Sequence, residues 1–134
     1  MRLAFAALAA CLLFPAAASA QDCANAADQA KLNECAAKAL HEADTQLNAD
    51  FKEIETRLAD DADAKKLFVE AQRAWIAFRD AECGFQSSGV AGGTAYPMIN
   101  ANCQAGLTNQ RLMDFKNYLA CEEGDMSCPV PAAE

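Results

Sequence analysis

The sequence predicts a small all-α protein, a disulfide-stabilised bundle of about three helices in which the first two are antiparallel. Apolar residues recur every three or four positions along three long stretches, which is the spacing of one helix face. No stretch shows the alternating pattern of a half-buried strand. Six cysteines follow the N-terminal leader, and an even number is typical of exported domains held by disulfides.

Residues 1–20 have the features of a signal peptide. Arg2 supplies the positive charge, residues 3–14 are apolar, and Ala18-Ser19-Ala20 fits the cleavage pattern of small residues. An alternative is lipid attachment at Cys11, but the apolar stretch before that cysteine is too short for a lipoprotein leader. We therefore expect cleavage after Ala20 and a periplasmic or secreted protein without a transmembrane segment.

The remaining chain is divided into one helical domain, residues 21–121, and a short C-terminal turn and tail, residues 122–134. The first helix is expected over residues 28–59, with Asp28 as its N-cap. Its apolar stripe consists of Leu40, Ala43, Leu47, Phe51, Ile54 and Leu58. A bond between Cys23 and Cys35 would fold the N-terminal arm back onto this helix.

The second helix is expected over residues 64–83, after the acidic break at residues 60–63. Its apolar residues are Leu67, Phe68, Ala71, Trp75 and Phe78. Because the connection is so short, the first two helices should pack as antiparallel neighbours.

A loop is expected over residues 84–94, where four of the six glycines lie. The third helix should follow, from residue 94 or 95 to Leu119, with Pro97 in its first turn. A bond between Cys83 and Cys103 would connect the second and third helices and contribute about 3 kcal/mol by restricting the unfolded chain.

Cys121 and Cys128 would then pair across a short acidic turn, and residues 129–134 would form a flexible tail. Six cysteines permit many pairings, so the sequence alone leaves the connectivity open.

The charge balance is strongly acidic, with 19 acidic residues against 11 basic ones. Cleavage of the leader removes Arg2 and makes the balance more negative still. Nucleic acid is therefore disfavoured as a partner, because phosphate binding requires a basic surface. A basic protein is favoured, because opposite charge accelerates encounter, although solubility explains the same composition.

The sequence offers little for catalysis or metal binding. His41 is the only histidine, and its position predicts a surface residue near acids. The cysteines lack the close paired spacing of a zinc site. The acids of residues 60–63 lack the glycine and the distal glutamate of a calcium loop. We therefore expect a protein that is not an enzyme, with no catalytic residue, cofactor or metal.

One stripe of the second helix combines aromatic, cationic and acidic side chains, from Gln72 through Trp75 and Arg79 to Glu82. Asp44 and Asn48 lie one turn apart on the first helix and could face it. These residues form either a binding site or a structural polar network, and we predict the network. Arg79 should pair with Asp44 or Glu82, while Trp75 and Phe78 should anchor the three helices.

The glycine-rich loop has two interpretations, a partner-binding loop or a plain connection between helices. The binding interpretation rests on small residues and exposed apolar side chains held by a disulfide. Its candidate contact residues are Phe85, Gly89, Val90, Gly92, Gly93 and Thr94.

Residues 72–83 have the pattern Gln-Arg-x-Trp-x-x-x-Arg-Asp-x-Glu-Cys, and this run resembles the LprI-type lysozyme-inhibitor family. Further matching positions are Cys35, Asp44, Leu47, Asn48, Phe51, Gly92, Gly93, Thr94, Cys103, Leu107, Thr108 and Arg111. The resemblance covers nearly the whole mature chain. It implies an exported, helical, disulfide-bonded envelope protein that inhibits lysozyme.

The sequence thus leaves three functions open. The first is inhibition of a basic lysozyme of unspecified type by acidic protein–protein docking. The second is a non-enzymatic periplasmic interaction or stress-response module with a different partner. The third, an enzyme acting on cell-wall material, is disfavoured by the scarcity of histidine and of aromatic residues that could bind sugar. The oligomeric state is not determined.

Overall fold

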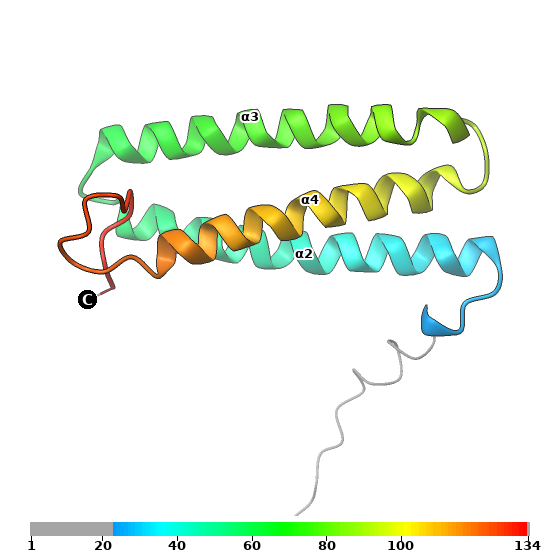
Figure 1. Ribbon diagram of the computed structural model, residues 1–134, viewed down its shortest axis with the longest axis horizontal. Coiled ribbons are helices and arrows are strands. Elements are labelled where there is room, and N and C mark those ends of the chain that lie inside the picture. Colours follow the sequence, from blue (N-terminus) through cyan, green and yellow to red (C-terminus); the bar gives the residue numbers. More distant parts are fainter. Residues whose placement is uncertain (1–22, 134) are drawn as a thin grey trace, which may run out of the picture.

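The computed structural model describes residues 23–133, so the expected leader, its cleavage site and Cys11 lie outside the described residues. The elements are three long helices, α2 (Gln29–Arg57), α3 (Ala62–Gln86) and α4 (Tyr96–Leu119), and one short 3-10 helix, η1 (Ser88–Val90). α3 runs antiparallel to α2, and α4 returns in the direction of α2 (Figure 1). The prediction of an all-α bundle with an antiparallel first pair is confirmed.

Local capping sets the N-terminal bounds of the first two helices. The carboxylate of Asp28 accepts a hydrogen bond from the backbone N–H of Lys31 at 2.9 Å, as expected for the N-cap of α2. Asp61 does the same for α3 by accepting from the N–H of Ala64 at 2.9 Å. Because Asp61 takes this role, α3 begins two residues earlier than predicted.

The end of α3 differs from the prediction. The helix passes through Gly84 and ends at Gln86, whose side chain donates to Glu82 at 2.8 Å. Ser87 then ends the helix, and its hydroxyl donates to the carbonyl of Cys83 at 2.6 Å. The connection is therefore residues 87–95, shorter than the expected loop, and Phe85 belongs to the helix. α4 begins at Tyr96 with Pro97 in its first turn, as predicted.

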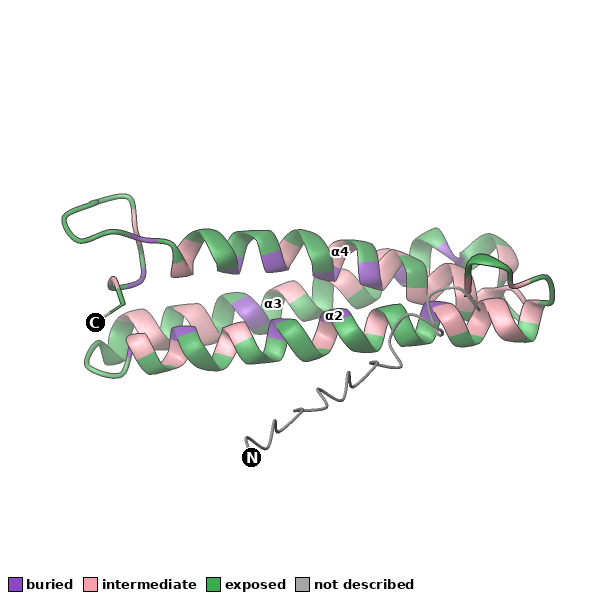
Figure 2. Ribbon diagram, turned by 90° about the horizontal axis from the view of Figure 1, so that it is seen from below, coloured by how far each residue is buried: buried purple, intermediate pink, exposed green. Residues whose placement is uncertain are grey.

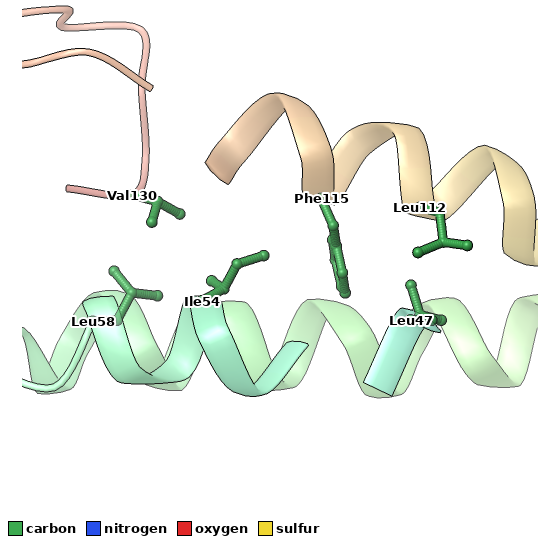
Figure 3. Packing of buried hydrophobic residues seen from close by; sticks show 6 residues of the cluster. All are labelled: Leu47, Ile54, Leu58, Leu112, Phe115 and Val130. Carbon is green, nitrogen blue, oxygen red and sulfur yellow. The ribbon is translucent and has the colours of Figure 1, made fainter. Parts of the chain in front are cut away.

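The hydrophobic core lies mainly between α2 and α4. Leu47 and Ile54 of α2 face Leu112 and Phe115 of α4, and Ile54 and Phe115 are completely buried (Figure 3). Leu58, the residue that follows α2, belongs to the same cluster. The buried positions of the helices form narrow patches along otherwise exposed or half-buried surfaces (Figure 2). No helix within residues 23–133 is apolar over a run long enough to cross a membrane.

α3 adds two half-buried aromatic residues to this core, Phe68 and Trp75. The ring of Phe68 stacks on Phe51 with centroids 4.9 Å apart and lies 5.3 Å from the ring of Phe115. The prediction that Phe78 also anchors the bundle is wrong, because its side chain is 53% exposed. At about 100° per residue, Phe78 lies roughly a quarter turn from the centre of the inward face of α3.

Three disulfides each join one cysteine to the next cysteine along the described chain: Cys23–Cys35, Cys83–Cys103 and Cys121–Cys128. These are the pairs considered from the sequence. The first folds the N-terminal arm onto α2, the second ties α3 to α4, and the third closes a hairpin after α4.

The expectation of a flexible tail does not hold at Val130. Its side chain is 3% exposed and belongs to the core cluster with Ile54 and Leu58 (Figure 3). The Cys121–Cys128 hairpin turns the chain back over the end of α2, where Leu58 presents an apolar surface. Burial of both side chains favours this arrangement, so the core extends beyond residue 121.

Val130→Ala should therefore lower the free energy of unfolding by about 1–3 kcal/mol, through lost burial and an unfilled space. Urea denaturation followed by circular dichroism measures this change. Met126→Ala is the matched control, because Met126 is fully exposed on the same hairpin and should show almost no change. Equal stability of the Val130 variant and wild type would mean that the tail does not stabilise the core.

Candidate functional site

The side chain of Arg79 connects all three long helices. Its Nη1 donates to Asp44 Oδ1 of α2 at 2.8 Å and to Thr108 Oγ1 of α4 at 3.1 Å. The guanidinium carbon lies 5.3 Å from the ring centroid of Trp75, one turn earlier on α3. The Arg79 side chain is only 12% exposed, and Thr108 is completely buried. Arg79 therefore positions α3 against the α2–α4 pair.

A second arginine joins α3 and α4 about two turns away along the same face of α3. Arg111 donates through Nε to Gln72 Oε1 at 3.1 Å, and its guanidinium carbon lies 4.8 Å from the ring centroid of Phe115. Gln72 is 7% exposed, so this bond satisfies a buried polar group. Arg111 also reaches Asp114 at 3.3 Å.

The structure brings together most, but not all, of the residues expected in the polar network. Asp44, Trp75 and Arg79 meet directly, and Gln72 is held by Arg111. Glu82 instead accepts from Gln86 at 2.8 Å, and Asn48 is exposed on α2.

Sequence reasoning assigned no role to Thr108 and Arg111. Their spacing of three places them on one face of a helix, which was the available signal. Nothing in that spacing indicates which polar partners the face will meet.

This cluster has the chemistry of a structural network. Arg79 and Gln72 are bonded to other side chains of the bundle, and His41 lies exposed on α2. Within residues 23–133, no group of three or more histidine, cysteine or acidic residues is arranged to hold a metal ion. The described contacts of Arg79 and Arg111 hold the helices together.

Six acidic residues gather at the end of the bundle where α2 meets α3 and the C-terminal hairpin folds back (Figure 1). We call them the acid end. Asp61 lines one cleft of about 320 Å³ together with Glu122, Glu123 and Asp125. The floor of the cleft is apolar and includes Leu58, Pro129 and Val130. The acid end consists of Asp60, Asp61, Asp63, Glu122, Glu123 and Asp125, and all six are exposed.

The negative charge of the acid end is not neutralised by ion pairs in the described part of the chain. Arg57 and Lys65, which are near it in sequence, pair with Glu53 at 3.0 Å and Glu55 at 3.8 Å. Hydrogen bonds from the hydroxyl and the backbone N–H of Ser127 lower the pKa of Asp125. That carboxylate therefore remains charged at a lower pH than a free aspartate.

The opposite end of the bundle carries the short connection, residues 87–95, which contains no charged residue. Hydrogen bonds fix both ends of this connection. Asn100 donates to Ser87 Oγ at 3.1 Å, and Asn33 donates to the carbonyl of Thr94 at 3.0 Å. Gly92 adopts a φ of +77°, a backbone conformation that would be strained for any residue with an L side chain.

The residues predicted to form a binding loop are thus divided between three elements. Phe85 lies on α3, Gly89 and Val90 on η1, and Gly92, Gly93 and Thr94 in the turn before α4. Their role in binding stays a proposal.

The fold and surface define a small, disulfide-stabilised helical protein with one acidic pole. The chain belongs to the LprI family, because the family model described as "Lysozyme inhibitor LprI" matches residues 20–115. An uncharacterised protein of Rhizobium meliloti (strain 1021) is 34% identical over 92% of this chain and 99% of its own length. No solved structure matches the chain.

Arg79→Ala should lower the free energy of unfolding by about 2–4 kcal/mol, because Asp44 and Thr108 lose their partner. The loss should be smaller than for a fully buried pair, since 37% of the Asp44 side chain is exposed. Urea denaturation provides the measurement. Arg73→Ala, at an exposed position of the same motif, should stay within about 0.5 kcal/mol of wild type. If the two substitutions lowered the free energy of unfolding equally, Arg79 would not have the structural role described above.

Proposed function

We propose that this protein is an exported, non-enzymatic inhibitor of lysozyme that docks on a basic lysozyme through its acid end. Membership in the LprI family is the observation that carries the proposal. The acid end adds a physical basis, since six exposed carboxylates lie at one pole without neutralising partners among the described residues. The proposed result of docking is that substrate is kept from the carbohydrate cleft of the enzyme.

Charge and apolar surface would contribute differently to such docking. Long-range attraction between an acidic pole and a basic enzyme increases the rate of encounter and weakens with added salt. Affinity requires buried contact as well, and Pro129, which is exposed in the same cleft as the acidic residues, offers apolar surface for it.

The disulfides support export, because three such bonds persist in an oxidising compartment. The signal peptide at residues 1–20 is proposed as the route to the periplasm or the exterior. Lysozyme acts on the cell wall in that same compartment.

A second candidate function is an envelope interaction module for a different basic protein. It is favoured by one observation, namely that an acidic pole attracts any basic partner and has no feature specific to lysozyme. Stable capture of another periplasmic protein, with lysozyme activity unaffected, would select this function.

Titration of lysozyme with the purified mature protein should abolish cell-wall lysis at a stoichiometric ratio. The apparent association rate should fall steeply between low and physiological salt, as expected for attraction between exposed charges. Turbidity of a cell suspension reports lysis, and surface plasmon resonance reports the rate. Undiminished lysis at large excess of the protein would exclude the inhibitor function.

Neutralising the acid end should slow association about two- to tenfold without unfolding the bundle. Half of the acid end, residues 122–125, lies beyond the family match, so the two halves are tested separately. One variant is Asp60→Asn with Asp63→Asn, and the other is Glu122→Gln with Glu123→Gln.

The matched control removes the same charge far from the acid end, by Glu34→Gln with Glu42→Gln on exposed positions of α2. It should associate at nearly the wild-type rate. If the control slows as much as the acid-end variants, only net charge matters. If instead Val90→Ser abolishes binding and the acid-end variants do not, the contact is the connection between α3 and α4.

A further inference from the structure

The outer face of α3 carries an apolar stripe that no other element of the described chain covers. Its large members are strongly exposed: Leu67 by 67%, Phe78 by 53% and Phe85 by 76%. Its small members, three alanines, are exposed as well. We call this stripe the outer seam, and it consists of Leu67, Ala71, Ala74, Phe78, Ala81 and Phe85.

The spacing of the outer seam is that of a helix-pairing surface. Successive members are separated alternately by 4 and 3 positions, so every two steps cover the seven residues of the heptad found where two helices pack knobs into holes. The face of α3 that contacts the core is different and contains Phe68, Gln72, Trp75 and Arg79. α3 is therefore apolar on two faces, and among residues 23–133 only one of them packs against the rest of the bundle.

We propose that the outer seam binds a second copy of this chain, with the two α3 helices antiparallel across a two-fold axis. In this register Ala74 faces Phe78 of the second copy, Ala71 faces Ala81, and Leu67 faces Phe85. Each contact then occurs twice, as a two-fold interface requires. Alanines opposite alanines allow close approach of the helices, and an alanine opposite a phenylalanine leaves room for the ring.

The charge distribution selects the antiparallel orientation. A helix of 25 residues is about 37 Å long, so antiparallel pairing places the two acid ends at opposite poles of the dimer. That separation exceeds the Debye length of about 8 Å at physiological salt, and repulsion between the acid ends is screened. Parallel pairing would place the two acid ends side by side and is opposed by their repulsion.

An apolar groove beside the outer seam supplies a place for Phe85 of the second copy. The groove measures about 230 Å³ and lies between α3, α4 and the C-terminal tail. Leu67 and Ala71 of the outer seam form one wall, while Tyr118 and Val130 line the groove on the α4 and tail side. Since Leu67 faces Phe85 of the second copy, this exposed ring is brought to the groove and can bury itself there.

Sedimentation equilibrium of the mature protein, from micromolar to millimolar concentration, tests the proposal. Wild type should approach twice the monomer mass, and Phe78→Glu should weaken dimerisation at least tenfold by placing a charge in the seam. Ile76→Glu is the matched control, because Ile76 is also exposed on α3 but lies outside the seam. Circular dichroism and urea denaturation verify that both variants remain folded.

The register is tested by complementary charges. Ala71→Glu and Ala81→Lys should each weaken the dimer, and the double variant should recover most of the wild-type association. Recovery requires position 71 to face position 81 of the second copy, which occurs only in the antiparallel register.

A wild-type protein that stays monomeric at millimolar concentration overturns the proposal. A double variant that associates no better than the single variants overturns the antiparallel register. If Phe78→Glu abolishes lysozyme inhibition in a protein that is monomeric throughout, the seam binds lysozyme and the self-pairing is rejected. Loss of inhibition in the acid-end variants alone bears on the proposed function and leaves the dimer unaffected.

Discussion

The position of α3 depends on one charged side chain held between the other two helices. Arg79 bonds to Asp44 of α2 and to Thr108 of α4. The hydrophobic residues that α3 adds to the core cluster, Ala64, Phe68 and Trp75, are only partly buried. Because hydrophobic contact does not distinguish rotational positions of a helix strongly, a directional bond at this site determines which face of α3 points inward. The motif that characterises the sequence therefore builds the scaffold.

Once α3 is oriented, the surface of the bundle is divided into regions with different chemistry. One pole is acidic, the connection between α3 and α4 at the other pole contains no charged residue and lies next to the Cys83–Cys103 disulfide, and the outer seam of α3 is apolar. The acid end and the outer seam differ in chemistry, and they adjoin at Leu58, Pro129 and Val130, which line both the acidic cleft and the groove beside the seam. An antiparallel dimer would then present two acid ends facing away from each other, and one dimer could engage two enzyme molecules.

The sequence by itself determined the features that depend on neighbouring residues. Helical spacing predicted three helices, Asp28 was recognisable as an N-cap, and Pro97 could be accommodated only in a first turn. The disulfides join cysteines close in sequence, so the pairs were accessible to the same reasoning. Trp75 and Arg79 stood out because an aromatic ring and a cation share one helical stripe. These features are local, and local geometry is set by the order of residues.

Only the tertiary structure decided how the helices are rotated and what their ends meet. Phe78 was expected inside and lies outside, because it is about 60° around the helix from Trp75, and the face of α3 that packs on the core does not extend that far. Val130 was expected in a flexible tail and is buried, because the hairpin returns the chain to Leu58, far away in sequence. Such outcomes depend on the packing of surfaces distant along the chain, and helical periodicity carries no information about which surfaces will meet.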